Sequence, residues 1–129
     1  MIDVVLDTNV IISGMLWAGT PKTILQMAQQ HLIQTISSEP LIEELKDVIA
    51  RDKFQKFLNQ LQKTPDDVVN SYLNYTRVIE PVELSQNVVR DMKDDKVITC
   101  AIGGKADYLI TGDNDLLILK TYQGIRIVT

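Results

Sequence analysis

The chain has 129 residues but only one cysteine, Cys100, and one histidine, His31. A single cysteine excludes an internal disulfide and a cysteine-rich zinc site, and a single histidine leaves little room for histidine-based catalysis. We expect Cys100 to pack as a small hydrophobe and His31 to lie on the surface at a helix end. This cysteine usage suits a reducing cytoplasm, which is the location we expect.

Long apolar runs and an excess of positive charge are also absent. The apolar runs are far shorter than a bilayer span, and Met1 leads into a predicted strand rather than a signal peptide. The formal net charge is −4, which is the wrong sign for binding nucleic acid through bulk charge. With 45% hydrophobic and 23% charged residues, the composition indicates one globular domain spanning residues 1–129.

Short apolar runs alternate with segments of helical periodicity along the chain. We expect strands at 4–6, 33–36, 77–82, 108–111 and 125–128. We expect helices at 21–32, from 39 onward through about 61, at 65–73, at 91–102 and at 116–119, with 14–21 as a break. This alternation is typical of an α/β fold, in which helices cover both faces of a parallel sheet.

Two strands are followed directly by acidic residues. Ligands bind beyond the carboxyl ends of strands in such sheets, and Asp7 follows the first strand. Asp7, Thr8 and Asn9 are also good N-cap residues, so this stretch alone supports a helix cap as well as a site. After the fourth strand, Asp113 lies nearest the strand end, whereas Asp115 is better placed to cap the short helix that follows.

Helical phase selects one acid from each of two neighbouring pairs. At 100° per residue, Glu44 borders the apolar stripe of its helix, whereas Glu43 points roughly opposite it. Asp94 lies close to the core-facing line of a later helix and Asp95 about 90° from it. Asp91 suits the N-cap of that helix. Glu44 and Asp94 are therefore the candidates, although exposed helix charges are the commoner fate of such pairs.

A pocket formed by Asp7, Glu44, Asp94 and Asp113 would gather like charges, which repel one another. A hard divalent cation such as Mg²⁺ or Mn²⁺ removes this penalty and prefers oxygen ligands. Phosphodiester hydrolysis is the reaction that such a pocket serves best without histidine or cysteine, because the cation orients and acidifies water.

Four segments of the chain resemble the acidic motifs of PIN-domain ribonucleases. They are Leu6-Asp7-Thr8-Asn9-Val10, Glu43-Glu44-Leu45, residues 91–96, and residues 106–113 ending in Thr111-Gly112-Asp113. The match is closest to the branch of toxin–antitoxin toxins similar to VapC. The resemblance implies that Asp7, Glu44, Asp94 and Asp113 are the catalytic and metal-binding acids. It also implies polar support from Thr8 or Asn9 and from Thr111, with Asp115 as a possible further acid.

The same resemblance implies a three-layer α/β/α fold with a parallel five-stranded sheet in the order 3-2-1-4-5. It further implies Mg²⁺ or Mn²⁺ dependence, cleavage of RNA, a homodimer, and a small antitoxin protein that blocks the cleft. One departure is Met92, which stands where the family commonly carries a proline. This change loosens the turn but leaves Asp94 in register.

Four cations near the middle of the chain are candidates for contacts with RNA phosphates: Lys46, Arg51, Lys53 and Lys56. A solvated helix face is the alternative interpretation of these residues.

Two other classes of protein compete with the nuclease hypothesis. A receiver-like Mg²⁺-binding signalling module also places aspartates at strand ends, but it needs an adjacent acidic pair near the first strand and a lysine at a late strand end. A catalytically silent α/β interaction domain remains open. A haloacid-dehalogenase-type phosphatase is disfavoured, because it needs Asp-x-Asp where this chain has Asp7-Thr8-Asn9.

Overall fold

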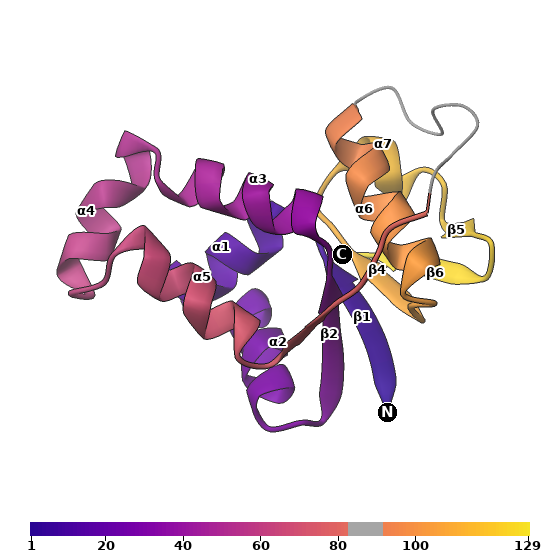
Figure 1. The fold of residues 1–129 in the computed structure, drawn as a ribbon, viewed down its shortest axis with the longest axis horizontal. Helices are drawn as coiled ribbons and strands as arrows, with labels where there is room; N and C mark the ends of the chain where they lie inside the picture. Colours follow the sequence, from indigo (N-terminus) through magenta and orange to yellow (C-terminus); the bar gives the residue numbers. More distant parts are fainter. Residues whose placement is uncertain (83–91) are drawn as a thin grey trace.

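The protein folds into a six-stranded sheet with helices on both faces (Figure 1). The computed structural model describes residues 1–82 and 92–129, and of residues 92–95 only the backbone. The strands are β1 (Ile2–Leu6), β2 (Ile33–Ser37), β3 (Thr76–Val78), β4 (Tyr108–Ile110), β5 (Thr121–Tyr122) and β6 (Ile125–Val128). The helices are α1 (Thr8–Leu16), α2 (Thr20–Gln29), α3 (Glu39–Ile49), α4 (Asp52–Gln60), α5 (Pro65–Leu73), α6 (Met92–Gly103) and α7 (Asn114–Leu117).

The strand order is β3-β2-β1-β4-β6-β5. The first five positions are joined by parallel pairings and match the predicted order 3-2-1-4-5, with β6 as the fifth predicted strand. The sixth strand, β5, is an antiparallel addition at the edge that the sequence analysis missed. Gln123 and Gly124 join β5 to β6, and both have positive φ angles (49° and 84°), as a tight hairpin turn requires.

The third strand is shorter than predicted. The prediction placed a strand at 77–82, but β3 ends at Val78. The Ile79 N–H still donates to the Ser37 carbonyl oxygen (2.9 Å), after which the Val82 N–H donates to Thr99 in α6 (3.3 Å). Pro81 lies between them and has no N–H to continue a ladder. The strand therefore ends four residues earlier than the apolar character of the segment suggests.

Alternating side chains of the central strand β1 build two cores, one on each face of the sheet. Val4 and Leu6 pack into a cluster with α1 to α5, including Leu45 and Leu58. Val5 packs into the other cluster, with α6 and α7. Both β1 faces are buried, as expected of a central parallel strand. The predicted three-layer α/β/α arrangement is thus confirmed.

Helix α1 begins directly after β1 and continues through Gly14, where the sequence predicted a break. Gly14 is buried, and a Cβ at this position would lie 2.8 Å from the Pro21 carbonyl oxygen. Glycine therefore lets the start of α2 approach α1 closely instead of ending the helix. The N-cap of α2 is Gly19 (φ 133°) rather than Thr20, so that helix starts one residue earlier than predicted.

The expectations for the two scarce residues are confirmed. Cys100 is buried within α6, and burial raises the pKa of its thiol to about 11. His31 is exposed just after α2, with a φ of 61°. Among the helices of the described residues, none is long and apolar enough to cross a bilayer.

Candidate active site

Asp7 stands at the carboxyl end of β1 and also begins α1. Its Oδ1 accepts a hydrogen bond from the Thr8 N–H (2.7 Å), which makes Asp7 the N-cap of the helix. Its Oδ2 accepts from the Thr111 hydroxyl (2.7 Å). The parallel register explains this second contact, because Leu6 pairs with Ile110 and the next residue of each strand comes into reach. The cap and the candidate site are therefore the same carboxylate.

Thr111 connects this carboxylate to the acid that follows β4. The Thr111 side chain is almost fully buried (1% exposed), and its hydroxyl oxygen accepts from the Asp113 N–H (3.0 Å). The Asp113 Oδ1 in turn accepts from the Asp115 N–H (2.9 Å). Asp113, rather than Asp115, is thus the N-cap of α7, which corrects the assignment made from sequence.

Glu44 reaches the same region from α3. Its Oε2 accepts from the hydroxyl of Thr8 (3.0 Å), and Thr8 is buried. Glu43 is exposed and forms an ion pair with Lys46 (3.4 Å). The helical phase that separated Glu44 from Glu43 is therefore confirmed. Ser38 caps the start of α3, since its side chain accepts from the Leu41 N–H.

Two threonines thus link three acidic residues, Asp7 and Glu44 through their carboxylates and Asp113 through its backbone N–H. We call this set the carboxylate network: Asp7, Glu44 and Asp113 with Thr8 and Thr111. The network draws on β1, α1, α3 and the turn after β4. The sequence left open whether Thr8 or Asn9 gives the polar support at the first motif. The hydroxyl of Thr8 makes the contact, whereas Asn9 is exposed and forms no side-chain hydrogen bond within the described residues.

A family model described as PIN domain matches residues 3–115, a range that holds the whole network. The chain belongs to the PIN domain family. Comparisons with curated proteins and with solved structures return no match. PIN domains are generally nucleases, and they usually use divalent metals.

The third acidic motif of this PIN domain lies at the start of α6. Asp94 falls within the first turn of that helix, but its side chain and that of Asp95 lie outside the described part of the structure, as does Asp91 altogether. The prediction for Asp94 therefore stays a prediction.

Asp107 belongs to the opposite end of the sheet, although it precedes Asp113 by only six residues. Its Oδ2 accepts from the N–H of Asp3 (2.9 Å), at the start of β1. Arg77 lies 3.7 Å from the Asp3 carboxylate. Asp107 and Asp113, which are close in sequence, thus lie at opposite ends of the PIN-domain sheet. Asp107 serves as a natural control for substitutions at the network.

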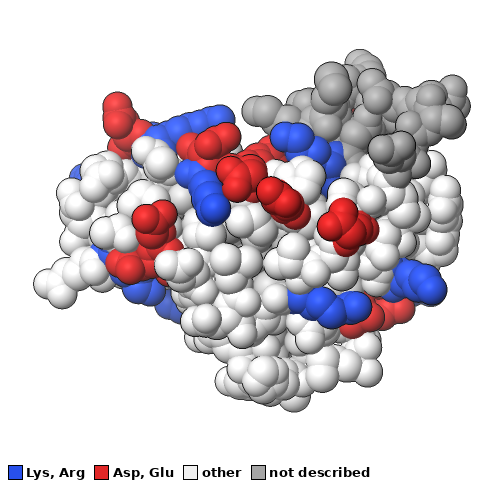
Figure 2. Space-filling model, in the orientation of Figure 1, with Lys and Arg blue, Asp and Glu red and all other residues white. Residues whose placement is uncertain are grey.

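The four cations predicted to contact RNA are exposed. Lys46 pairs with Glu43, and the Lys53 ammonium lies 5.1 Å from the centre of the Phe54 ring. Arg51, Lys53 and Lys56 lie at or within α4, at the end of the molecule away from β4 and β6 (Figure 1). Charges of both signs are interspersed over this face rather than forming a continuous basic stripe (Figure 2). RNA binding by these residues stays a prediction.

The donor atoms of the network suit a hard cation, since they are carboxylate and hydroxyl oxygens only. Within residues 1–82 and 96–129, no three acidic, histidine or cysteine side chains are close enough to hold a metal ion as a group. Mg²⁺ does not require such a group, because it keeps several waters and commonly binds through one or two carboxylates together with substrate phosphates. The residues present therefore fit the metals that PIN domains usually use.

Proposed function

We propose that this PIN domain is a metal-dependent endoribonuclease and the toxin of a toxin–antitoxin pair. The observation that carries the proposal is the carboxylate network, in which hydrogen bonds through Thr8 and Thr111 connect acids far apart in the sequence near the carboxyl ends of β1 and β4. Gathering like charges at one place destabilises a fold unless a ligand offsets the repulsion. Membership of the PIN family supports a nuclease as the reason for this arrangement.

In the proposed enzyme, Asp7, Glu44, Asp94 and Asp113 hold Mg²⁺ or Mn²⁺. When bound, such an ion orients and acidifies water and stabilises the charge of an in-line displacement at phosphorus. Thr111 and Thr8 act as positioning residues, since each donates its hydroxyl proton to a carboxylate and fixes the direction of its oxygens. Asp113 is in turn oriented by the N–H of Asp115.

RNA as the substrate, a homodimer, a small antitoxin partner that blocks the cleft, and a cytoplasmic location are inferred from the resemblance of the four motifs to the toxin branch. The candidate cations Lys46, Arg51, Lys53 and Lys56 would contribute phosphate contacts, because the site itself is acidic. Growth arrest on expression, relieved by co-expression of a small neighbouring reading frame, would test the toxin assignment directly.

The decisive experiment is cleavage of a labelled RNA by the purified protein with Mg²⁺, with Mn²⁺ and with a chelator. We expect cleavage with either metal and none with the chelator. Asp7→Asn and Glu44→Gln should each abolish most of the activity, whereas Glu43→Gln and Asp107→Asn should retain it. Equal losses in the paired variants would contradict the assigned roles. A folded wild-type protein that cleaves no RNA with either metal would favour the silent interaction domain.

Asp7→Asn should also leave the protein folded, because an asparagine oxygen can still accept from the Thr8 N–H. The lost hydrogen bond from Thr111 costs about 1 kcal/mol, and relief of charge repulsion offsets part of this. We therefore expect the melting temperature to change by a few degrees at most. Calorimetry on the wild type and the variant checks this, and a large loss would mean that Asp7 is mainly a structural cap.

A further inference from the structure

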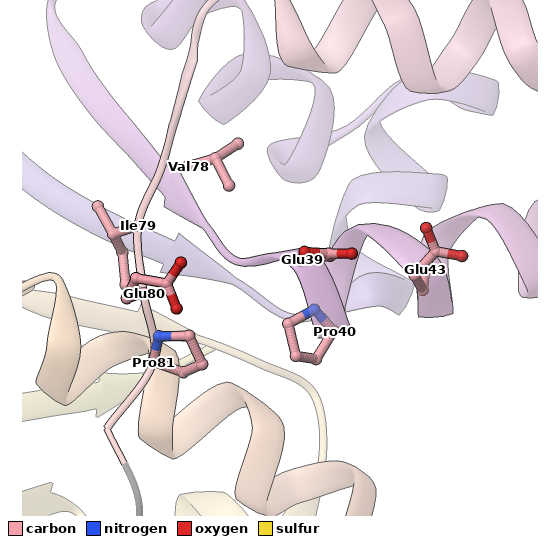
Figure 3. A pocket seen from close by; sticks show the side chains of 7 residues that line it. All are labelled: Glu39, Pro40, Glu43, Val78, Ile79, Glu80 and Pro81. Carbon is pink, nitrogen blue, oxygen red and sulfur yellow. The ribbon is translucent and has the colours of Figure 1, made fainter.

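A groove lies between the start of α3 and the segment that follows β3 (Figure 3). It has a volume of about 540 Å³. One wall is the start of α3, with Glu39, Pro40 and Glu43. The other wall is the extended segment from Val78 to Pro81, which leaves the sheet at the end of β3. Its volume falls within the range of roughly 300–1,000 Å³ typical of sites that bind small molecules or short segments.

The walls of the groove carry apolar surface that the fold leaves uncovered. Val78 is 49% exposed, and its side chain points toward the start of α3 in Figure 3. Pro40, Ile79 and Pro81 add half-buried apolar surface beside it. Among the described strands, β3 is the outermost on this side of the sheet and pairs with β2 alone. An apolar occupant of the groove would therefore cover side chains that water now contacts.

In the part of the chain that the structure describes, the charged residues that line the groove are all acidic: Glu39, Glu43 and Glu80. Of these, Glu43 pairs with the exposed Lys46, whereas Glu39 and Glu80 make no ion pair within the described residues. Such a surface repels RNA phosphates. It also does not match a single metal ion, because these carboxylates do not form a group close enough to hold one. The complementary charge must instead come as separate cations spaced along an occupant.

We propose that this groove binds an extended polypeptide segment of a partner protein, in which basic side chains alternate with apolar ones. The apolar side chains would pack on Val78 and Pro40, and the basic side chains would pair with Glu80 on one wall and Glu39 on the other. A polypeptide supplies apolar and cationic side chains at once, whereas a nucleic acid brings phosphates of the same sign as the groove. The proposal does not depend on nuclease activity, because none of its residues belongs to the carboxylate network.

The test is fluorescence anisotropy with a short fluorescein-labelled peptide in which arginine and valine alternate, at low salt. The variant E39Q/E43Q/E80Q removes the three charges and keeps the side-chain shapes. The matched control is D47N/D52N/D66N, which removes three exposed acids that do not line the groove. We expect the first variant to bind about tenfold more weakly and the control to bind nearly as the wild type does. Val78→Ser should weaken binding as well, since it removes apolar contact without a change in charge.

Equal losses in the two triple variants would mean attraction by net charge alone and would overturn the proposal. If spermidine competes with the labelled peptide as effectively as unlabelled peptide does, the groove recognises positive charge alone. That result would overturn the polypeptide assignment. Absence of peptide binding to the wild type would also overturn it. Melting curves on each variant establish that it is folded. Glu80→Gln lies outside any helix and gives a single-charge test if the triple variant does not fold.

Discussion

Two buried threonines, Thr8 and Thr111, hold the acids of this PIN domain in position. A carboxylate on a flexible side chain adopts many rotamers, and its oxygens are useful only when they point in one direction. The hydroxyl of Thr111 donates to Asp7 and accepts from the Asp113 backbone, so one group sets the positions of two acids. Neutral side chains can do this without adding to the repulsion between the carboxylates.

Thr111→Val should therefore lower RNA cleavage by about tenfold to a hundredfold, the usual cost of losing a hydrogen-bonding neighbour of a metal ligand. Valine keeps the buried volume but leaves Asp7 without its hydroxyl donor and the Asp113 N–H without its acceptor. Thr111→Ser restores the hydroxyl and should recover most of the activity. The readouts are the cleavage rate and the Mn²⁺ affinity measured by calorimetry. Equal activity and affinity in the valine and serine variants would show that the hydroxyl has no positioning role.

At the scale of helices and strands, most of the architecture could be predicted because its signals are local. The alternation of apolar runs with helical stripes predicted a parallel sheet with two covered faces, and the resemblance to PIN domains implied the strand order. The start of α3 at residue 39 was predicted, and helical phase separated Glu44 from Glu43, but the helical stretch expected from 39 through about 61 is two helices, with α3 ending at Ile49 and α4 beginning at Asp52. The two-residue strand β5 was missed, because two residues carry no periodicity. The length of β3 was overestimated, because an apolar run does not reveal where a strand loses its partner.

The candidate site was likewise predicted from sequence only in part. Strand ends and helix phase were enough to propose Asp7, Glu44 and Asp113, but the choice between Thr8 and Asn9 depends on tertiary contact with α3. The cap of α7 was assigned to Asp115, because both acids lie at suitable positions in the sequence. In the structure Asp113 is the cap, and its backbone N–H donates a hydrogen bond to the buried hydroxyl of Thr111. Contacts between residues distant in the chain have no local signature.

The packing of α1 against α2 gives a test at this scale. Gly14→Ala should destabilise the protein by about 1–2 kcal/mol, because the added methyl group would meet the Pro21 carbonyl oxygen at 2.8 Å. The better helix propensity of alanine offsets only part of this cost. Gly112→Ala is the control, since no atom lies within 4 Å of its added Cβ. Urea unfolding of both variants measures the difference, and equal stabilities would contradict the close approach of the two helices.

For the whole molecule, buried groups that resist ionisation predict how stability changes at alkaline pH. Burial raises the pKa of the Cys100 thiol from 9.0 to about 11, and burial also raises the pKa values of Tyr72 and Tyr75. The unfolded chain therefore loses these protons at lower pH than the folded protein does. The free energy of unfolding should be unaffected below pH 9 and should fall as the pH rises toward 11.

Cys100→Ala should remove the part of this decline that begins near pH 9, while the tyrosines still contribute at higher pH. One proton corresponds to a slope of at most about 1.4 kcal/mol per pH unit. Urea unfolding of the wild type and the variant across this range measures both slopes. The absolute stability of the variant can differ through packing, so the slope is the quantity to compare. An unchanged slope between pH 9 and pH 10 would contradict the assignment to Cys100.

The central position of β1 has a consequence for how the protein is made. β1 is synthesised before β2 and can pair with it early, but its other neighbour, β4, follows about a hundred residues later. A nascent chain thus carries Asp7 and Glu44 while Thr111 and Asp113 are still to be translated or remain within the ribosome. An enzyme that cuts RNA would be harmful to the ribosome and message that produce it. With its site divided between segments about a hundred residues apart, such an enzyme stays incomplete until the second segment has been translated and has left the ribosome.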